Sequence, residues 1–300
     1  MQTWLAPAKL NLFLHVVGRR ADGYHLLQSV FCLIDWCDEI RITTDERGKI
    51  HRAESLDWAE DDDLAIRAAR ALKAHSQACG LLSEAAGAEV SIRKAIPNGA
   101  GLGGGSSDAA TTLMALNALW GLHLPRETLA EIGLTLGADV PFFLHGQAAL
   151  VGGIGESMQS LQPAAQWFVV VVPPQVVPTA LIFRDPSLVR DSVPMPPSDL
   201  QLACKDARWT AGQNDLEPVA CRQFPVVAQW RDQLARVATG LGLPPAAVRM
   251  SGSGGACFVS CQHHEEAQTL AQALVTQGLA ADRVRVCRAL ARHPASEQLP

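Results

Sequence analysis

A short glycine-rich segment is the feature of this chain that most directly suggests chemistry. The twelve residues from Pro97 to Asp108, PNGAGLGGGSSD, contain five glycines, and two serines follow the last of them. Glycine adopts conformations with positive φ and lets a ligand approach the main chain closely. Free N–H groups that lead into a helix N-terminus form a site for anionic oxygens. The segment therefore predicts a loop that binds the phosphates of a nucleoside triphosphate.

Better-known glycine loops fit this segment poorly. Gly99, Gly101 and Gly104 satisfy G-x-G-x-x-G, but that dinucleotide motif needs an acidic residue about 20 positions later, and none occurs between Ala109 and Arg126. A Walker A loop needs Lys after its last glycine, where this chain has Gly105. A protein-kinase glycine loop joins two strands, whereas this one leads from a strand into a helix. The position of the segment between a strand and a helix also argues against a flexible linker.

Three further segments place polar residues where a phosphate site could use them. Lys9 and Asn11 interrupt an apolar strand and share one face of it, because strand side chains alternate; an edge-strand Lys9 in solvent is the alternative. Asp139 stands alone in an apolar segment, where it could equally serve as a turn or capping residue. The turn SGSGG (Ser251–Gly255) is glycine-rich, and a tight hairpin is its simpler explanation.

Composition indicates a globular protein of two domains. The chain has 300 residues, 48% of them hydrophobic and 18% charged, which suits a soluble fold larger than one core. A net charge of −5 gives no sign of binding to nucleic acid or membrane. No signal peptide is recognised, and the apolar stretch Trp167–Val172 is too short to cross a bilayer. We expect a cytoplasmic protein whose eight cysteines are reduced thiols.

The elements that must position these residues follow from periodicity and from turn-forming residues. Strands are predicted at Trp4–Ala8, Leu10–Val17, Ser29–Trp36, Glu39–Thr44 and Ala88–Ala95. Glu46-Arg47-Gly48 predicts a hairpin turn. Helices are predicted from Leu64 to near Gly80, over Ser106–Trp120, and from Leu124 to a break at Gly137–Pro141.

A domain boundary is expected near Ser160. Beyond it the sequence predicts a strand at Trp167–Val172 and then an irregular, proline-rich segment that includes Pro186, Pro194, Pro196 and Pro197. Helices are predicted at Val226–Ala238 and Glu265–Gln277, and strands at Val248–Met250, Ala256–Ser260 and Arg283–Cys287.

Taken in chain order, the motifs resemble those of the GHMP small-molecule kinases, which include galactokinase, homoserine kinase and mevalonate kinase. The three matching segments are PAKLNLFL (Pro7–Leu14), PNGAGLGGGSSDAA (Pro97–Ala110) and SGSGGACF (Ser251–Phe258). The resemblance covers nearly the whole chain. It implies an α+β fold with a domain like ribosomal protein S5 domain 2 over residues 1–160 and a ferredoxin-like domain over residues 161–300.

Further segments resemble one branch of this family. They are GRRADGYHLLQSVF (Gly18–Phe31), LGADVPFFL (Leu136–Leu144) and IFRDP (Ile182–Pro186). The branch phosphorylates the 2-hydroxyl of 4-diphosphocytidyl-2-C-methyl-D-erythritol with ATP, in the non-mevalonate route to isoprenoid precursors. The alternatives are a homoserine- or mevalonate-type kinase, for which a base-binding Gly-Tyr-His segment has no use, and an inactive sensor, which has no need of Lys9 and Asp139.

The resemblance also implies roles for individual residues. Asp139 is the expected base for the acceptor hydroxyl, with Lys9 beside it. ATP phosphates are assigned to Pro97, Gly99, Gly101, Gly103, Gly104, Gly105, Ser106 and Ser107, and Lys94 is expected near the nucleotide. The acceptor is assigned to Asn11, Tyr24, His25, Phe31, Thr179 and Phe183, with Tyr24 and Phe183 enclosing the cytosine ring and His25 reading its polar edge.

Two expectations concern charge near the nucleotide. Mg²⁺ should accompany ATP and bind mainly phosphate and water, so no protein ligand is named. Where the family often has Asn in a segment like EDNL, this chain has Asp63, before Leu64. Its carboxylate could repel phosphate or accept from an adenine amino group.

Overall fold

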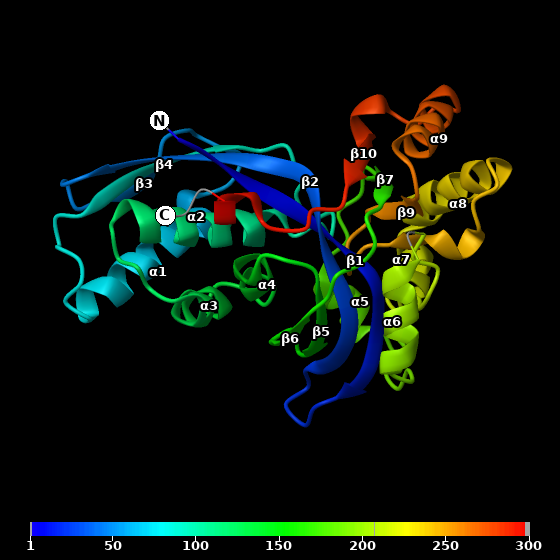
Figure 1. The fold of residues 1–300 in the computed structure, drawn as a ribbon, viewed down its shortest axis with the longest axis horizontal. Coiled ribbons are helices and arrows are strands. Elements are labelled where there is room, and N and C mark those ends of the chain that lie inside the picture. The colour runs from blue at the N-terminus through cyan, green and yellow to red at the C-terminus, as the bar shows by residue number, and fades with distance from the viewer. Residues whose placement is uncertain (1, 207, 298–300) are drawn as a thin grey trace.

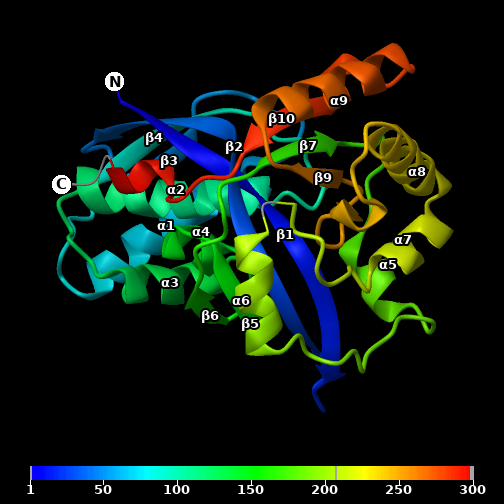
Figure 2. The same ribbon diagram turned by 45° about the vertical axis from the view of Figure 1, so that its right-hand side comes forward.

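Two very long strands organise the first sheet. In this computed structural model, which describes residues 2–206 and 208–297, β1 (Thr3–Arg19) and β2 (His25–Asp45) pair antiparallel over most of their length. They run between two groups of helices (Figures 1 and 2). The sequence predicted each as two separate strands, but register shifts at Pro7/Ala8, Asn11/Phe13 and Val16/Gly18 let the ladder bend without ending.

The remaining strands join the edge of β2 that faces away from β1, with β4 along Glu39–Asp45 and β5 along Leu27–Phe31. Their order is β3-β4-β2-β5-β6, with β1 also beside β2. The bounds are β3 (Ile50–Arg52), β4 (Gly87–Arg93), β5 (Ala149–Gly153) and β6 (Ser157–Ser160). All of these pairs are antiparallel except β3 with β4.

The predicted hairpin at Glu46-Arg47-Gly48 is wrong. Strand β3 pairs in parallel with β4 and not with β2. The Gly48 N–H donates to the Ala85 carbonyl at 2.7 Å, and the Ala88 N–H donates to the Lys49 carbonyl at 2.9 Å. These bonds direct the chain past β4. Strand β3 therefore lies on the side of β4 that faces away from β2.

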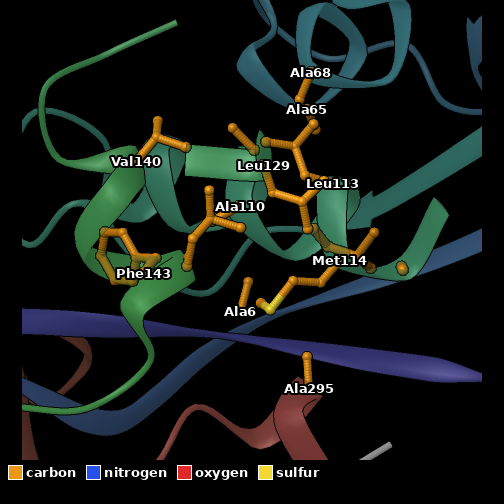
Figure 3. Packing of buried hydrophobic residues seen from close by; sticks show 14 of the residues in the cluster. Ala6, Ala65, Ala68, Ala110, Leu113, Met114, Leu129, Val140, Phe143 and Ala295 are labelled. Atoms are coloured by element: carbon orange, nitrogen blue, oxygen red, sulfur yellow. The ribbon is translucent and has the colours of Figure 1, made fainter. Parts of the chain in front are cut away.

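Four helices lie under the first sheet (Figure 1). They are α1 (Leu64–Ala78), α2 (Gly104–Leu119), α3 (Arg126–Leu134) and α4 (Val140–His145). Helix α2 begins two residues earlier than predicted and is the central one, since ten of its residues are buried. Figure 3 shows Leu113 and Met114 of this helix among side chains from β1, α3, α4 and the C-terminal segment. A helix surrounded in this way holds its N-terminus in a fixed position.

The second sheet is antiparallel, with the order β10-β7-β9-β8. Its strands, β7 (Trp167–Val171), β8 (Val248–Met250), β9 (Cys257–Cys261) and β10 (Val284–Arg288), lie within one residue of their predicted positions. The helices of this half include α7 (Glu217–Gln223), which was not predicted, and α8 (Pro225–Gly240) and α9 (His264–Thr276), which were. Short 3-10 turns occur at Glu60–Asp62, Pro245–Ala247, Ala281–Arg283 and Pro294–Glu297.

The segment predicted to be irregular contains a helix at each end. Helix α5 (Thr179–Arg184) precedes its first proline, and α6 (Pro197–Lys205) begins on its last. Proline is favourable at the first position of a helix, because its missing N–H would have no partner there. The prediction of an irregular segment therefore holds only between the two helices.

Strand β1 belongs to both halves of the molecule. Trp4 and Ala6 pack in the core of the first half, whereas Leu14 and Val16 pack against the second sheet. Between them, Ala8, Leu10, Leu12 and Phe13 join a third buried cluster that contains residues of both sheets. The two sheets separate between Ser160 and Trp167, but β1 crosses this division, and the boundary near residue 160 stays a prediction.

Neither a membrane-spanning helix nor a disulfide occurs within the described residues. No helix in residues 2–206 or 208–297 is long and apolar enough to cross a membrane. All eight cysteines are free thiols. Burial raises the pKa of Cys32 and of Cys261 to about 12 in each case. These thiols are therefore uncharged at neutral pH.

The C-terminal segment returns to the first half and is anchored there by His293. The His293 N–H donates to the Gly146 carbonyl at 2.7 Å, and the Ala295 N–H donates to the imidazole Nδ1 at 3.1 Å. The imidazole Nε2 lies 3.3 Å from the Thr111 hydroxyl of α2. Burial, followed by Arg126, lowers the pKa of His293 to about 3. The ring is thus held neutral in the folded protein.

We expect His293 to make the protein sensitive to acid. Its folded pKa lies below the ordinary 6.5, so the unfolded chain takes up the proton first and stability falls as the pH drops from 6.5 toward 3. Between pH 7 and pH 5 the loss is about 2 kcal/mol. Urea unfolding at both pH values should show it in the parent protein and in His263→Gln, an exposed control. The pH difference should be smaller in His293→Gln; an unchanged difference would contradict the assignment.

Candidate active site

A cleft of about 800 Å³ lies where the two halves meet. It receives residues from β1, β2, the start of α2, the turn before α4, α5 and the Ser251–Gly255 turn. The structure brings together nine of the predicted site residues in its lining: Lys9, Asn11, Tyr24, His25, Phe31, Ser106, Asp139, Thr179 and Phe183.

Lys9 and Asp139 form an ion pair in this cleft. The Lys9 Nζ lies 3.5 Å from Asp139 Oδ2, although 130 residues separate them in sequence. The Lys9 side chain is 5% exposed and the Asp139 side chain 35% exposed. Lys9 comes from the buried middle of β1, and Asp139 stands immediately before α4. The arrangement presents a carboxylate to the cleft with an ammonium group fixed behind it.

Two further contacts fix the Lys9 ammonium group. It donates to Asn11 Oδ1 at 2.5 Å and lies 4.6 Å from the centre of the Phe31 ring. The Asn11 amide nitrogen donates to the Ser29 hydroxyl at 3.0 Å, and that hydroxyl donates to the Phe13 carbonyl. This chain of bonds turns the Asn11 oxygen toward Lys9. Ser29 was not predicted, because a serine in an alternating strand gives no signal.

The glycine loop has the conformation that its composition predicts. Gly99, Gly101 and Gly103 have φ values of 69°, 82° and 74°, a region that side-chain-bearing residues rarely adopt. Gly103 precedes α2, so Gly104, Gly105 and Ser106 form its first turn, and within residues 2–206 and 208–297 no side chain caps it. The N-terminus of a buried helix therefore offers unpaired N–H groups to an anion.

The glycine loop contacts the second glycine-rich turn backbone to backbone. A Cβ atom on Gly254 would lie 2.1 Å from the Gly101 nitrogen and 2.2 Å from the Ala100 carbonyl carbon. The Ala256 N–H donates to the Ala100 carbonyl at 3.0 Å. The Ser251 hydroxyl lies 3.3 Å from the Gly101 carbonyl and accepts from the Asn11 N–H at 3.2 Å. The Ser251–Gly255 turn is a hairpin connection between β8 and β9, and it also holds the loop beside β1.

Several residues assigned to ATP lie away from the cleft lining. Ser107 is buried, and its hydroxyl has no hydrogen-bond partner among the described residues. Pro97 is half-buried, and Gly99 is exposed beside Val176. Gly101, Gly103, Gly104 and Gly105 are likewise absent from the cleft lining, so the assignment of all seven residues to phosphate stays a prediction.

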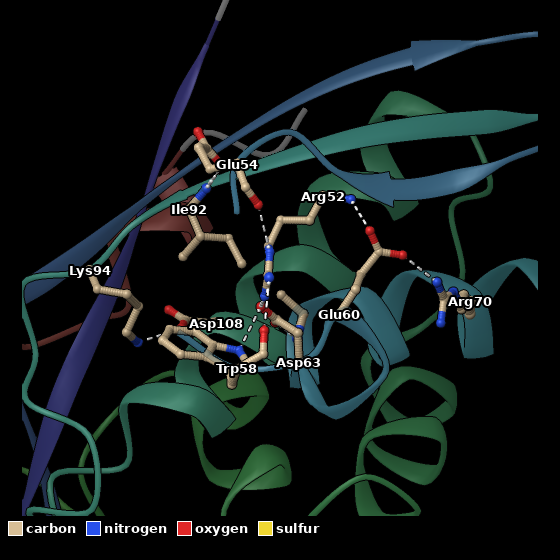
Figure 4. Close-up of polar contacts among 10 residues, drawn as sticks. Arg52, Glu54, Trp58, Glu60, Asp63, Arg70, Ile92, Lys94 and Asp108 are labelled. Atoms are coloured by element: carbon tan, nitrogen blue, oxygen red, sulfur yellow. Dashed lines mark hydrogen bonds and ion pairs between the residues drawn. The ribbon is translucent and has the colours of Figure 1, made fainter. Parts of the chain in front are cut away.

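Lys94 is engaged inside the protein (Figure 4). Its ammonium group donates to Asp38 Oδ2 at 2.5 Å and to Asp108 Oδ2 at 2.6 Å. Burial alone would lower the pKa of Lys94, but Asp108 and Asp38 outweigh it and the pKa is raised. Lys94 thus ties β2 to the first turns of α2. A direct contact with the nucleotide stays a prediction and would require Lys94 to leave these carboxylates.

Asp63 is also turned inward, although the sequence left its effect open (Figure 4). Its carboxylate caps α1 by accepting from the Ala65 N–H at 3.0 Å. It also accepts from Arg52 Nη1 at 2.9 Å and from Trp58 Nε1 at 3.2 Å. Asp63 and Arg52 are each 5% exposed. The guanidinium group balances the charge that would otherwise repel phosphate.

The far end of the cleft combines an aromatic surface with a histidine. Tyr24 is 62% exposed on the β1–β2 turn, and the His25 ring lies 5.0 Å from the Phe183 ring. The Thr179 hydroxyl lies 2.6 Å from the Ser253 hydroxyl, which joins α5 to the glycine-rich turn. Burial lowers the pKa of His25, with smaller effects from Arg190 and Arg19. Arg190 was not predicted, because it lies in the segment between α5 and α6 without a recognisable motif.

Gly254→Ala tests whether the two glycine turns must touch. The new methyl group would meet backbone atoms that cannot move independently, so we expect a loss of at least about 2 kcal/mol in unfolding free energy. ATP affinity should fall as well, because the glycine loop shifts. Gly240→Ala is the matched control, since no atom of the described residues lies within 4 Å of its new Cβ. Urea unfolding and calorimetric ATP titration measure both effects, and equal behaviour of the two variants would refute the contact's importance.

Comparison with known proteins gives consistent matches. Residues 63–147 match the family described as GHMP kinases N terminal domain, and residues 195–280 match GHMP kinases C terminal. The chain is 46% identical to 4-diphosphocytidyl-2-C-methyl-D-erythritol kinase of Burkholderia pseudomallei (strain 668) over 294 residues, 97% of this chain and 94% of that protein. The enzyme of the same name from Burkholderia thailandensis is 46% identical over 295 residues, covering the same shares of both chains.

Solved structures agree with these matches. A crystal structure of 4-(cytidine 5'-diphospho)-2C-methyl-D-erythritol kinase aligns with a TM-score of 0.76 and 35% identity, covering 96% of this chain and 99% of that one. Homoserine kinase from Cytophaga hutchinsonii aligns with a TM-score of 0.68 and 17% identity over 98% and 95% of the two chains. The second match concerns the fold alone.

Proposed function

The chain belongs to the GHMP kinase family of ATP-dependent enzymes, and we propose that it phosphorylates the 2-hydroxyl of 4-diphosphocytidyl-2-C-methyl-D-erythritol. Its two-domain fold of mixed α and β elements is the fold of that family. The observation that carries the proposal is the joining of the Lys9–Asp139 pair and the His25–Phe183 pair in one cleft. One pair suits the transfer of a phosphoryl group, and the other suits a planar base on the acceptor.

The residues of the cleft have different roles in phosphoryl transfer. Such a reaction depends on positioning and charge stabilisation more than on covalent chemistry. Asp139 accepts the proton of the acceptor hydroxyl, since it is the cleft carboxylate beside Lys9. The Lys9 ammonium stabilises negative charge on the phosphoryl group in transfer. The first-turn N–H groups of α2 hold the phosphates of ATP.

Mg²⁺ belongs to the same proposal. No group of three His, Cys, Asp or Glu side chains suited to a metal occurs within residues 2–206 and 208–297. The oxygen donors that line the cleft near the loop, the Ser106 hydroxyl and the Asp139 carboxylate, suit a hard cation held mainly by phosphate and water. The ion would neutralise phosphate charge when it is bound.

Release of ADP tests the proposed function. The protein is incubated with Mg-ATP and 4-diphosphocytidyl-2-C-methyl-D-erythritol, with homoserine and mevalonate in parallel. We expect ADP release with the cytidylated alcohol and none with homoserine or mevalonate. The product should be phosphorylated at the 2-hydroxyl. Release with homoserine or mevalonate instead would keep the phosphoryl-transfer residues and overturn the assignment of the acceptor.

Asp139→Asn should abolish turnover without abolishing ATP binding. The amide cannot accept the hydroxyl proton, and loss of a general base costs about 10²- to 10⁴-fold in kcat. The Lys9 contact keeps an oxygen partner in this variant, so the cleft should retain its shape. Single-turnover kinetics and calorimetric ATP titration measure the two properties. Near-parental kcat would show that another group, or none, takes the proton.

A further inference from the structure

Arg190 makes an unusually complete set of hydrogen bonds at the edge of the cleft. Its Nη1 donates to the Leu188 carbonyl at 2.9 Å, and its Nη2 donates to the carbonyls of Asp185 at 2.8 Å and Phe183 at 3.1 Å. Its Nε donates to His25 Nε2 at 3.1 Å. Three bonds therefore hold the guanidinium group on its own segment, and the fourth reaches across to β2.

The contact with Arg190 sets the tautomer of His25. A guanidinium group only donates, so His25 Nε2 must accept and the neutral ring carries its proton on Nδ1. Burial, Arg190 and Arg19 all lower the pKa of His25, which favours the neutral ring. Among the described residues the His25 ring has one hydrogen bond, from Arg190 to Nε2, so Nδ1 is left without an acceptor there, and His25 lines the cleft. The ring thus offers an N–H donor to a ligand.

We propose that Arg190 is a positioning residue that makes the cleft select cytosine over uracil by fixing His25 as an Nδ1–H donor. The proposal rests on the proposed function, because it concerns the base of the same acceptor. Ring atom N3 is an acceptor in cytosine and carries a hydrogen in uracil. The Nδ1–H of His25 can therefore donate to N3 of cytosine. With uracil it would face the N3–H group, and both donors would lack an acceptor, which weakens binding.

The same guanidinium group also supports the stacking surface. Its bond to the Phe183 carbonyl holds the residue whose ring lies 5.0 Å from His25. Arg190 therefore fixes the edge that reads the base and the ring beside it in one arrangement. Removing Arg190 should change the ratio of the affinities for the two bases. General loosening of the segment should instead lower both affinities equally.

Arg190→Met separates these possibilities, because methionine keeps the length of the side chain and donates nothing. Calorimetric titration with CDP and with UDP gives the affinity ratio for each protein. We expect the parent to prefer CDP by at least about 30-fold and the variant by less than about threefold, a change that corresponds to the loss of one hydrogen-bond match. With the cytidylated alcohol, KM should rise while kcat changes little.

Arg222→Gln is the matched control. Arg222 braces the same segment through Asp185 at 2.8 Å, and no hydrogen bond joins it to His25 in the described chain. This variant should keep the CDP preference. An Arg190→Met protein that also keeps it would overturn the proposal.

Nitrogen-15 spectroscopy of the full-length parent protein tests the tautomer directly. The His25 signals, assigned by their loss in His25→Gln, should show a protonated Nδ1 and an unprotonated Nε2. A protonated Nε2 would overturn the proposal even if Arg190→Met fails to fold. If CDP and the cytidylated alcohol are both inert, the proposed function fails, and the Nδ1–H signature still decides whether Arg190 sets the tautomer.

Discussion

The contact between the backbones of Gly101 and Gly254 is the constraint on which the active cleft depends. It leaves no room for a Cβ atom on either turn, since one on Gly101 would lie 2.5 Å from the Ser251 carbonyl oxygen. Through it the two sheets meet at a fixed distance, and Ser251 reaches both the glycine loop and the Asn11 backbone. The Lys9 N–H donates to the Leu102 carbonyl at 2.9 Å. The catalytic strand, the phosphate loop and the second half therefore share one junction.

Local pattern predicted the elements well and their long-range partners poorly. Strand alternation placed Lys9 and Asn11 on one face, and the run of glycines before α2 predicted the positive φ angles that the loop adopts. Nothing in the residues themselves placed Asp139 beside Lys9, because that proximity depends on how both β1 and α4 pack against α2; only the family resemblance suggested it. The prediction of a hairpin at Glu46–Gly48 was wrong for the same reason, since the bonds that direct the turn come from Ala85, before β4, and from Ala88, within it. The proline content likewise led to the prediction of irregular structure at α6, where a proline in fact begins the helix.

Buried cations in this protein differ in where their partners face. Lys94 and Arg52 pair with carboxylates that are themselves buried, and Arg249 donates to the four carbonyls of Leu12, Trp209, Ala211 and Ala246. These cations join elements, and their charge is satisfied inside the fold. Lys9 is equally buried, but its carboxylate partner is partly exposed to the cleft. An ion pair becomes available for chemistry when one member stays open to a ligand.

The return of the C-terminal segment has a consequence for how the protein is made. Ala295 is fully buried in the core that β1 and α2 form, and His293 bonds to α2 and to the residue that ends α4. A ribosome releases the chain from its N-terminus, and domains commonly fold as they emerge. Here the core of the first half includes Ala295, which is synthesised after the second sheet, and β1 packs against that sheet as well. The first half therefore cannot complete its core before the second half has been synthesised.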